Sequence, residues 1–152
     1  MAQLYMEVMM NIQDAMQMTK NFEGYSPHLY RCPAGYLTIG WGRNIEKRGV
    51  SKEEAEFMFQ NDYNNAIKDL KILAMENKID LTNVPQDVLF ALTDMMFNMG
   101  YDRLSKFKKL LYELKNDSYE GVAREMIDSA WYTQVGDRSK KLVEIVKNVT
   151  VR

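Results

Sequence analysis

Residues 22–43 read FEGYSPHLYRCPAGYLTIGWGR and, unlike the residues before them, combine glycine and proline with many aromatic side chains. Leu37, Ile39 and Trp41 alternate with Tyr, Thr and Gly, which is the period of a β-strand. The segment Cys32–Gly35 carries Pro at its second position and Gly at its fourth, a pattern typical of a β-turn. The stretch therefore predicts a small antiparallel sheet of about two or three strands, with the three alternating apolar residues in the core.

Helical patterns flank this sheet on both sides. Apolar residues recur at helical spacing from residue 3 to about 21, and Gly24 follows where a helix C-terminus commonly takes a left-handed residue. Ser51 and Glu54 form a capping box that begins a helix running to about residue 75. Further helices are expected over residues 85–100, 104–114, 117–127 and 137–146.

These elements predict an α+β fold. We expect a single domain over residues 1–152, with a small β-containing N-terminal lobe at about 22–50 and a long connecting helix at 51–76. Residues 77–152 form a helical C-terminal lobe. The pattern allows the first helix to pack with either lobe, and we assign it to the helical one. A cleft between two lobes is a usual place for a ligand.

Composition narrows the function class. The apolar fraction of 46% and the charged fraction of 27% are ordinary for a soluble globular protein and exclude global disorder. The net charge of −1 hides an asymmetry, because residues 1–102 carry 9 Lys/Arg against 14 Asp/Glu, whereas residues 103–152 carry 11 against 7. A basic C-terminal half is attracted to anionic polymers such as a bacterial wall or nucleic acid, and chance clustering on a solvated surface explains it equally well.

Cysteine and histidine counts exclude further classes. A single cysteine, Cys32, rules out an internal disulfide, and a single histidine, His28, argues against a zinc site, so no metal or other cofactor is expected. The first twenty residues contain Glu7 and Asp14 and lack a basic start and a continuous apolar run, so they do not form a signal peptide. No segment reaches the ~18 apolar residues of a membrane span.

Glu23 and Thr38 are the first candidates for chemistry. Glu23 lies at the end of the first helix, whose negative pole disfavours an ionised carboxylate, and a carboxylic acid kept protonated can serve as a general acid. The alternative is an exposed surface glutamate. Thr38 lies on the strand face opposite the apolar residues, so its hydroxyl is expected to face the cleft; the alternative is a β-forming residue on the wet side of a sheet.

Cys32 is the third candidate. Its neighbour Arg31 is expected to lower the pKa of the thiol, whereas a small buried apolar residue is the plainer interpretation. His28 lies four residues earlier, which raises the hypothesis of a Cys–His hydrolase. That hypothesis requires the imidazole to reach the sulfur.

Together, Glu23, Cys32 and Thr38 resemble the Glu–Asp/Cys–Thr triad of phage lysozymes, the endolysins of glycoside hydrolase family twenty-four. Three further segments resemble the interlobe helix and the C-terminal lobe of that family, and the likeness extends from about residue 8 to 147: VSKEEAEFMFQNDY, ALTDMMFNMG and SAWYTQVGDRSKK. The resemblance implies a lysozyme-like fold. It also implies a bacteriolytic muramidase, which hydrolyses the β-1,4 bond between N-acetylmuramic acid and N-acetylglucosamine in peptidoglycan.

The resemblance also implies roles for individual residues. Glu23 protonates the leaving oxygen, Cys32 holds or activates the attacking water in place of the more common Asp, and Thr38 positions that water. A free thiol has a pKa of ~8.5 and is mostly uncharged at neutral pH, so a bystander role for Cys32 stays open. The substrate-contacting positions are Phe97, Asn98, Gln134 and Asn44. The supporting positions are Arg138, which holds Glu23, and Arg43, for which Asp62 is the expected partner.

The same resemblance predicts the setting of the reaction. The substrate is bacterial peptidoglycan, nucleic acid is not a partner, and the protein is a monomer that needs no cofactor. It stays in the host cytoplasm before lysis and acts in the periplasm or cell wall once a holin-type partner permeabilises the membrane. Two rival hypotheses are a non-catalytic peptidoglycan-binding module and a Cys-dependent peptidase or amidase that cuts the stem peptides.

Overall fold

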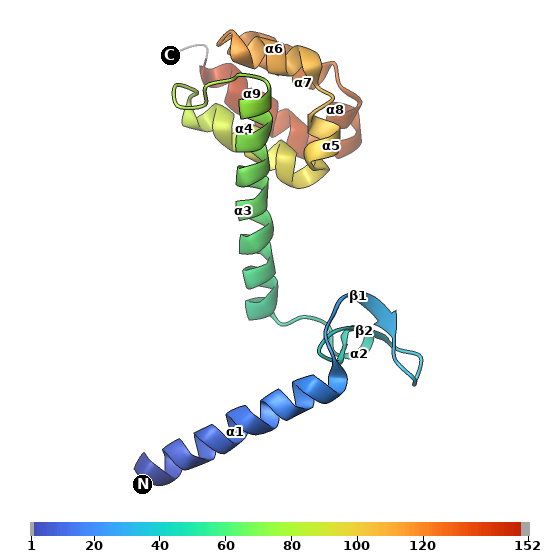
Figure 1. Ribbon diagram of the computed structural model, residues 1–152. Coiled ribbons are helices and arrows are strands. Elements are labelled where there is room, and N and C mark those ends of the chain that lie inside the picture. The colour runs from blue at the N-terminus through green and yellow to red at the C-terminus, as the bar shows by residue number, and fades with distance from the viewer. Residues whose placement is uncertain (1, 150–152) are drawn as a thin grey trace. The chain divides into compact units, whose positions relative to one another are not determined.

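The computed structural model describes residues 2–149, with side chains from residue 11 onward, and divides into two compact units. The first unit ends at Ala55 and the second begins at Glu56 (Figure 1). A small antiparallel sheet lies in the first unit, and most other described residues are helical. The predicted α+β class is therefore confirmed.

A helix and a small sheet make up the first unit. Helix α1 (Ala2–Glu23) ends at Gly24, which has a φ of 69° and donates its N–H to the Lys20 carbonyl at 2.9 Å. The left-handed residue expected at this helix end is present. The elements that follow form an antiparallel sheet in the order β1-β2-β3 and one short helix: β1 (Ser26–Arg31), β2 (Leu37–Gly40), β3 (Arg43–Asn44) and α2 (Ile45–Arg48).

The hairpin between β1 and β2 follows the predicted turn. The Gly35 N–H donates to the Cys32 carbonyl at 2.7 Å, and the Cys32 N–H donates to the Tyr36 carbonyl at 3.0 Å. Thr38 occupies the middle strand, where its Cα pairs with Tyr30 on β1 and with Asn44 on β3. The sheet therefore places Thr38 at its centre.

The predicted alternation of strand β2 is wrong. Thr38 is only 2% exposed, whereas Trp41, expected in the core, is 52% exposed, and Leu37 and Ile39 are half-buried. Strand β2 ends at Gly40, whose φ of 66° breaks the two-residue period before Trp41 is reached. Trp41 therefore belongs to a turn, and the face it occupies cannot be inferred from strand alternation.

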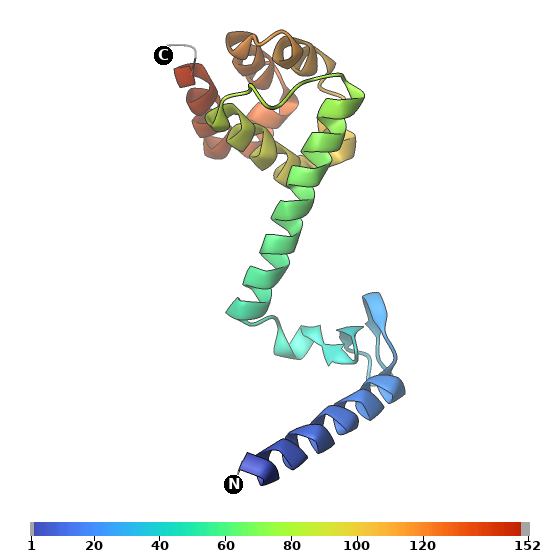
Figure 2. The same cartoon turned by 60° about the vertical axis from the view of Figure 1, so that its left-hand side comes forward.

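Helix α3 (Lys52–Glu76) begins with the predicted capping box and appears as one continuous helix in Figure 2. The Ser51 N–H donates to Glu54 Oε2 at 2.8 Å, and the Glu54 N–H donates to Ser51 Oγ at 3.2 Å. Sequence reasoning missed helices α2 and α8 and merged α5 with α6. The remaining helices are α4 (Gln86–Met99), α5 (Tyr101–Leu104), α6 (Lys108–Lys115), α7 (Tyr119–Ile127), α8 (Ala130–Val135) and α9 (Asp137–Val149).

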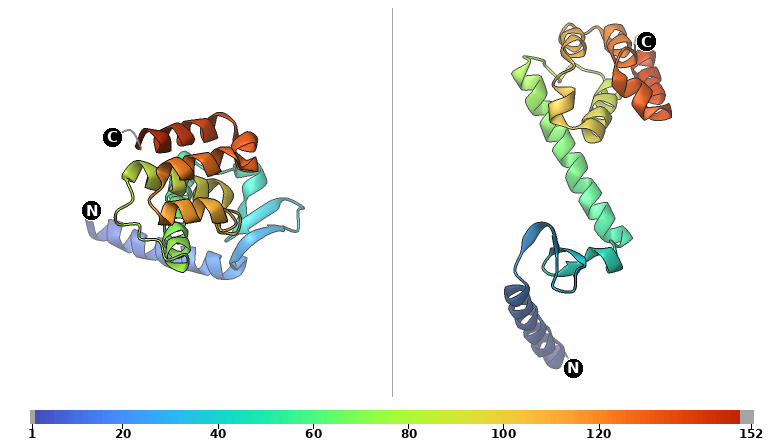
Figure 3. Two further views of the ribbon diagram at one scale, coloured as in Figure 1. Left: turned by 90° about the horizontal axis from the view of Figure 1, so that it is seen from above. Right: turned by 90° about the vertical axis from the view of Figure 1, so that its right-hand side faces the viewer.

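The apolar core lies in the second unit. Helix α9 packs against α4 and α7, and α6 packs against α7; Figure 3 shows α6, α7 and α9 as successive layers when viewed from above. The largest fully buried side chains come from these helices and from α3 and α5: Leu73, Leu92, Met95, Met96, Leu104, Leu110, Leu114 and Met126. Within residues 2–149, no helix combines the length and the apolar character needed to span a bilayer.

Candidate active site

Glu23 is the last residue of α1 and is exposed, and its carboxyl group lies against the β2–β3 turn. A Cβ added at Gly42 would lie 2.6 Å from Glu23 Cδ and 3.2 Å from its Cγ, well inside van der Waals contact. The carboxyl group therefore occupies the space that any other side chain at position 42 would fill. Gly42 also has a φ of 74°, a conformation that L-residues rarely adopt. This glycine thus permits both the turn and the approach of the acid.

Cys32 and Thr38 lie together at the hairpin. A hydrogen bond from the Tyr36 backbone N–H lowers the pKa of the Cys32 thiol below its ordinary value; partial desolvation opposes this shift, and the Thr38 hydroxyl adds to it. The Thr38 hydroxyl also donates a hydrogen bond to the Tyr36 carbonyl at 3.0 Å. The arrangement favours a thiolate that accepts hydrogen bonds from the backbone and from Thr38.

Asn44 pairs with Thr38 across the sheet, and the oxygen of its side-chain amide caps α2. Asn44 Oδ1 accepts a hydrogen bond from the Lys47 N–H at 3.0 Å. Asn44, which was predicted to contact the substrate, therefore caps a helix. Its amide N–H groups are not part of this cap, so they can still donate to a sugar oxygen.

The geometry of strand β1 argues against a Cys–His pair. His28 lies within the strand and Cys32 follows its end, four residues further on. At a rise of ~3.3 Å per residue, their Cα atoms are roughly 13 Å apart, which is too far for the imidazole and the thiol to meet. The Cys-dependent peptidase hypothesis therefore has no histidine that could act as the general base for Cys32.

Arg43 has a partner other than the predicted Asp62. Its guanidinium donates to Glu54 Oε1 at 2.6 Å and to the Gly49 carbonyl at 2.7 and 3.0 Å. Both partners lie within the first unit, close to the start of α3, so Arg43 ties strand β3 to the capping box of that helix. The three-residue segment between α2 and α3 brings Glu54 within reach of Arg43, which sequence spacing did not reveal.

We expect Glu54→Gln to lower the Tm at pH 7, because the amide cannot carry the charge that pairs with Arg43. A hydrogen bond from the Ser51 N–H, and then Arg43, hold the pKa of Glu54 below its ordinary value of 4.5. Its contribution to stability is therefore complete above about pH 4.5 and is lost as the pH falls through the folded-state pKa. Thermal melts at pH 7 and in acid should show a Tm difference that closes in acid.

Asp62→Asn is the matched control for that experiment. Asp62 is exposed on α3, and its change to asparagine removes one negative charge, as Glu54→Gln does. Its Tm should stay close to that of the unchanged protein at both pH values. A larger fall in Tm for Asp62→Asn than for Glu54→Gln would instead support the predicted pairing of Arg43 with Asp62.

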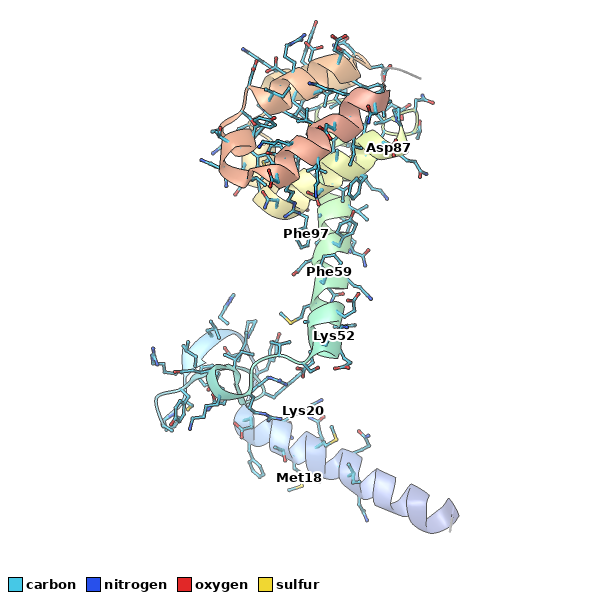
Figure 4. All side chains as sticks on the ribbon, turned by 180° about the vertical axis from the view of Figure 1, so that it is seen from behind. Met18, Lys20, Lys52, Phe59, Asp87 and Phe97 are labelled. Atoms are coloured by element: carbon cyan, nitrogen blue, oxygen red, sulfur yellow. The ribbon has the colours of Figure 1, made fainter. Side chains whose placement is uncertain are left out.

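Phe97 and Asp62 lie together in the second unit. The Phe97 ring contacts Phe59 and Tyr63, with ring centroids 5.5 and 6.0 Å apart, and Figure 4 shows the labelled Phe59 and Phe97 close to each other. A pocket of about 280 Å³ opens beside this cluster, and its lining combines carboxylates, an amide and apolar groups: Asp62, Asn65, Ala66, Asp69, Met96 and Phe97. Two predicted site residues thus share one polar pocket.

The other predicted residues of the second unit each have a partner that sequence reasoning missed. Asn98 Oδ1 accepts from Trp131 Nε1 at 3.0 Å. Gln134 Oε1 accepts from the guanidinium of Arg103 at 3.2 Å. The four-residue spacing of Asp94 and Asn98 puts both on one face of α4, which could have indicated a shared surface.

Arg138 forms a two-pronged ion pair with Asp94, at 2.7 and 2.9 Å, and this pairing raises the pKa of the guanidinium. The predicted contact of Arg138 with Glu23 joins residues of different units and stays a prediction. The site residues thus fall into two groups. Glu23, Cys32 and Thr38 belong to the first unit together with Arg43 and Asn44, and the remaining predicted residues belong to the second.

A small antiparallel sheet preceded by a helix that ends in an acid, in a chain that is otherwise mostly helical, is typical of a lysozyme-like protein of the α+β class. The sequence profile described as "Phage lysozyme" matches residues 20–147. The chain therefore belongs to the phage lysozyme family.

Relatives agree with this assignment at low identity. The chain is 26% identical to the "Probable T4-type lysozyme 2" of Dictyostelium discoideum, over 93% of this chain and 98% of that protein. It is 24% identical to "Probable T4-type lysozyme 1" of the same organism, over 92% and 97%. It is 27% identical to the "Peptidoglycan hydrolase gp36" of Pseudomonas phage phiKMV, over 81% of this chain but only 14% of that longer protein.

Proposed function

We propose that this protein is a muramidase that hydrolyses the β-1,4 bond between N-acetylmuramic acid and N-acetylglucosamine in bacterial peptidoglycan. Its membership of the phage lysozyme family and the name of its phage relative, a peptidoglycan hydrolase, support this substrate. The observation that carries the proposal is that the Glu23 carboxyl lies against Gly42, in the turn that follows strand β2, the strand that holds Thr38, the hydrogen-bond partner of Cys32.

The reaction needs one acid, one water and a proton acceptor. Glu23 donates its proton to the glycosidic oxygen as the C–O bond breaks, so the departing sugar leaves with a new hydroxyl group. Water adds to the anomeric carbon and gives up a proton, which restores the neutral products and yields a new reducing end. The Cys32 thiolate or a water held by Thr38 takes that proton, and a second proton transfer returns Glu23 to its acid form.

Cys32 variants test which group accepts the proton. We expect Cys32→Ser to lower kcat by about 10²-fold or more, because a hydroxyl is a far weaker base than a thiolate, and Cys32→Asp to keep activity. If the thiolate is the base, activity rises with pH through the lowered pKa of Cys32. The carboxylate of Cys32→Asp moves that rise to lower pH, because its pKa lies several units below that of a thiol.

The pH dependence of kcat/KM on isolated peptidoglycan measures this shift. Pro33→Ala is a suitable control at the neighbouring turn position, since it leaves the thiol in place. Identical pH profiles for Cys32→Asp and the unchanged protein, with full activity in Cys32→Ser, would leave Cys32 as a bystander. The base work would then fall to water and Thr38.

Product analysis tests the reaction itself. After digestion of purified peptidoglycan, mass spectrometry should find muropeptides with new reducing sugar ends. New free amines without reducing ends would instead identify a peptidase or amidase. Binding to the wall without any soluble product, and without clearing of chloroform-treated Gram-negative cells, would identify a non-catalytic binding module.

The setting of the reaction is part of the same proposal. The protein acts as a monomer in the periplasm or cell wall and depends on a holin-type partner to leave the host cytoplasm. Cells that express it alone should keep their turbidity until chloroform permeabilises the membrane. Lysis without chloroform would remove the need for a permeabilising partner.

A further inference from the structure

Two large aromatic side chains of the first unit are exposed beside the candidate acid. The rings of Tyr25 and Trp41 lie 5.0 Å apart with an interplanar angle of 44°, and their exposed fractions are 64% and 52%. Lys20 Nζ lies over the Trp41 ring, 4.6 Å from its centroid. We call these two rings the Trp41–Tyr25 pair. Exposed aromatic rings that contact each other indicate a binding surface more often than isolated ones.

Both rings are connected directly to the elements that position Glu23. Tyr25 follows Gly24, the residue that ends α1 immediately after the acid. Trp41 precedes Gly42, whose missing side chain leaves room for the Glu23 carboxyl. The pair therefore lies within the same small unit, on the two segments next to the acid. Figure 4 shows the labelled Lys20 at the end of α1 nearest the sheet.

The chemistry of the pair suits a sugar ring. The faces of aromatic rings carry negative charge density, which attracts the polarised C–H groups on one face of a pyranose. The Lys20 ammonium offers three donors, and no ion pair holds it among the described side chains 11–149. Sites of this kind combine apolar contact area with a few polar groups that fix orientation.

We propose that the Trp41–Tyr25 pair, with Lys20, is a stacking subsite for an N-acetylhexosamine of the glycan strand, beside the bond that Glu23 cuts. This inference rests on the proposed muramidase function and adds a binding position to it. The pair holds the sugar in the ground state and the transition state alike. Its loss should therefore raise KM and leave kcat nearly unchanged.

Kinetics on soluble glycan strands give the first test. We expect Trp41→Ala to raise KM about five- to tenfold, the fold-change that one aromatic stacking contact supplies, while kcat stays within about twofold. Trp41→Phe should restore most of the affinity, because it keeps an aromatic face. Tyr112→Ala is the matched control: Tyr112 is 66% exposed on α6 in the second unit, and its loss should change neither constant.

Fluorescence gives a second test that does not depend on turnover. Trp41 and Trp131 are the chain's two tryptophans, and Trp131 is only 2% exposed, so acrylamide should quench Trp41 selectively. We expect chitotetraose to protect this fluorescence in the Glu23→Gln variant, which cannot cut it. Lys20→Gln should weaken the protection, and Tyr112→Ala should leave it unchanged.

The outcomes separate the inference from the proposed function. Hydrolysis by the unchanged protein, together with an unaltered KM in Trp41→Ala and no protection by chitotetraose, would overturn the subsite alone. Absence of hydrolysis would overturn the muramidase proposal, whatever the fluorescence shows. A Trp41→Ala variant that loses kcat rather than affinity would also contradict the subsite, provided that its circular dichroism matches that of the unchanged protein.

Discussion

Glu23→Gln is expected to abolish hydrolysis of peptidoglycan, with a fall in kcat of about 10²- to 10⁴-fold, the range that general acid catalysis contributes. The amide keeps the shape and the hydrogen-bonding capacity of the side chain, but it has no acidic proton to give the leaving oxygen. Because the substrate still fits, KM should change little. Release of reducing ends from purified peptidoglycan, followed over hours, gives the rate.

Glu56→Gln is the matched control for this substitution. Glu56 is exposed on α3, and its Oε1 accepts a hydrogen bond from Gln60 at 3.2 Å, a role that a glutamine oxygen can also fill. The control should have the activity and the Tm of the unchanged protein. Full activity in Glu23→Gln would remove this residue as the acid, and with it the mechanism proposed above.

Features that depend on a few neighbouring residues could be predicted from the sequence. The capping box of Ser51 and Glu54, the turn that ends in Gly35 and the left-handed Gly24 all occur where expected. Each of these features is determined by side chains or glycines within four residues of one another. Local chemistry therefore defined the helix starts and the hairpin without knowledge of tertiary contacts.

Short helices and the partners of side chains in the folded protein could not be predicted from the sequence. Helix α8 has only six residues, too few for an apolar period, although the side chain of Ser129 caps it by accepting the Tyr132 N–H at 3.3 Å. Arg43 was predicted to pair with Asp62, and within the first unit it pairs with Glu54. A contact with Asp62, which belongs to the second unit, stays a prediction. An arginine reaches any carboxylate that the fold brings near it, and the sequence does not show which one that is.

In the candidate site, too, some residues could be predicted from the sequence and others could not. Glu23, Cys32 and Thr38 were found from the spacing of residue types that resembles a family triad. The role of Gly42 was not found, because glycine in a turn is common and its special need here comes from the side chain of Glu23. The burial of Thr38 was also missed, since a four-residue strand shows too few side chains to reveal which face is covered.

Gly42→Ala is expected to lower kcat by about 10²-fold, the effect of a misplacement of about 1 Å in a catalytic group. The added methyl group would occupy the space of the Glu23 carboxyl, so the acid must move away from the sheet. The positive φ at this position adds a stability cost of about 1–2 kcal/mol for an L-residue. Rates on purified peptidoglycan and thermal melts measure the two effects separately.

Gly40→Ala separates the displaced acid from the strained backbone. Gly40 has a similar φ of 66°, but no atom lies within 4 Å of the Cβ that alanine would add. Gly40→Ala should therefore lose only the stability that its positive φ costs and keep its activity, whereas Gly42→Ala should lose more stability and most of its activity. If the two variants lost activity equally, backbone strain would explain the effect, and the contact between Gly42 and the acid would have no catalytic meaning.

A double-mutant cycle tests the contact directly. Shortening the acid in Glu23→Ala removes the carboxyl that an alanine at position 42 would strike. The Gly42→Ala change should then cost less stability in that background than in the unchanged protein, and only the cost of its positive φ should remain. Equal costs in the two backgrounds would mean that the side chains at positions 23 and 42 do not meet, and the acid would lose its defined place against the β2–β3 turn.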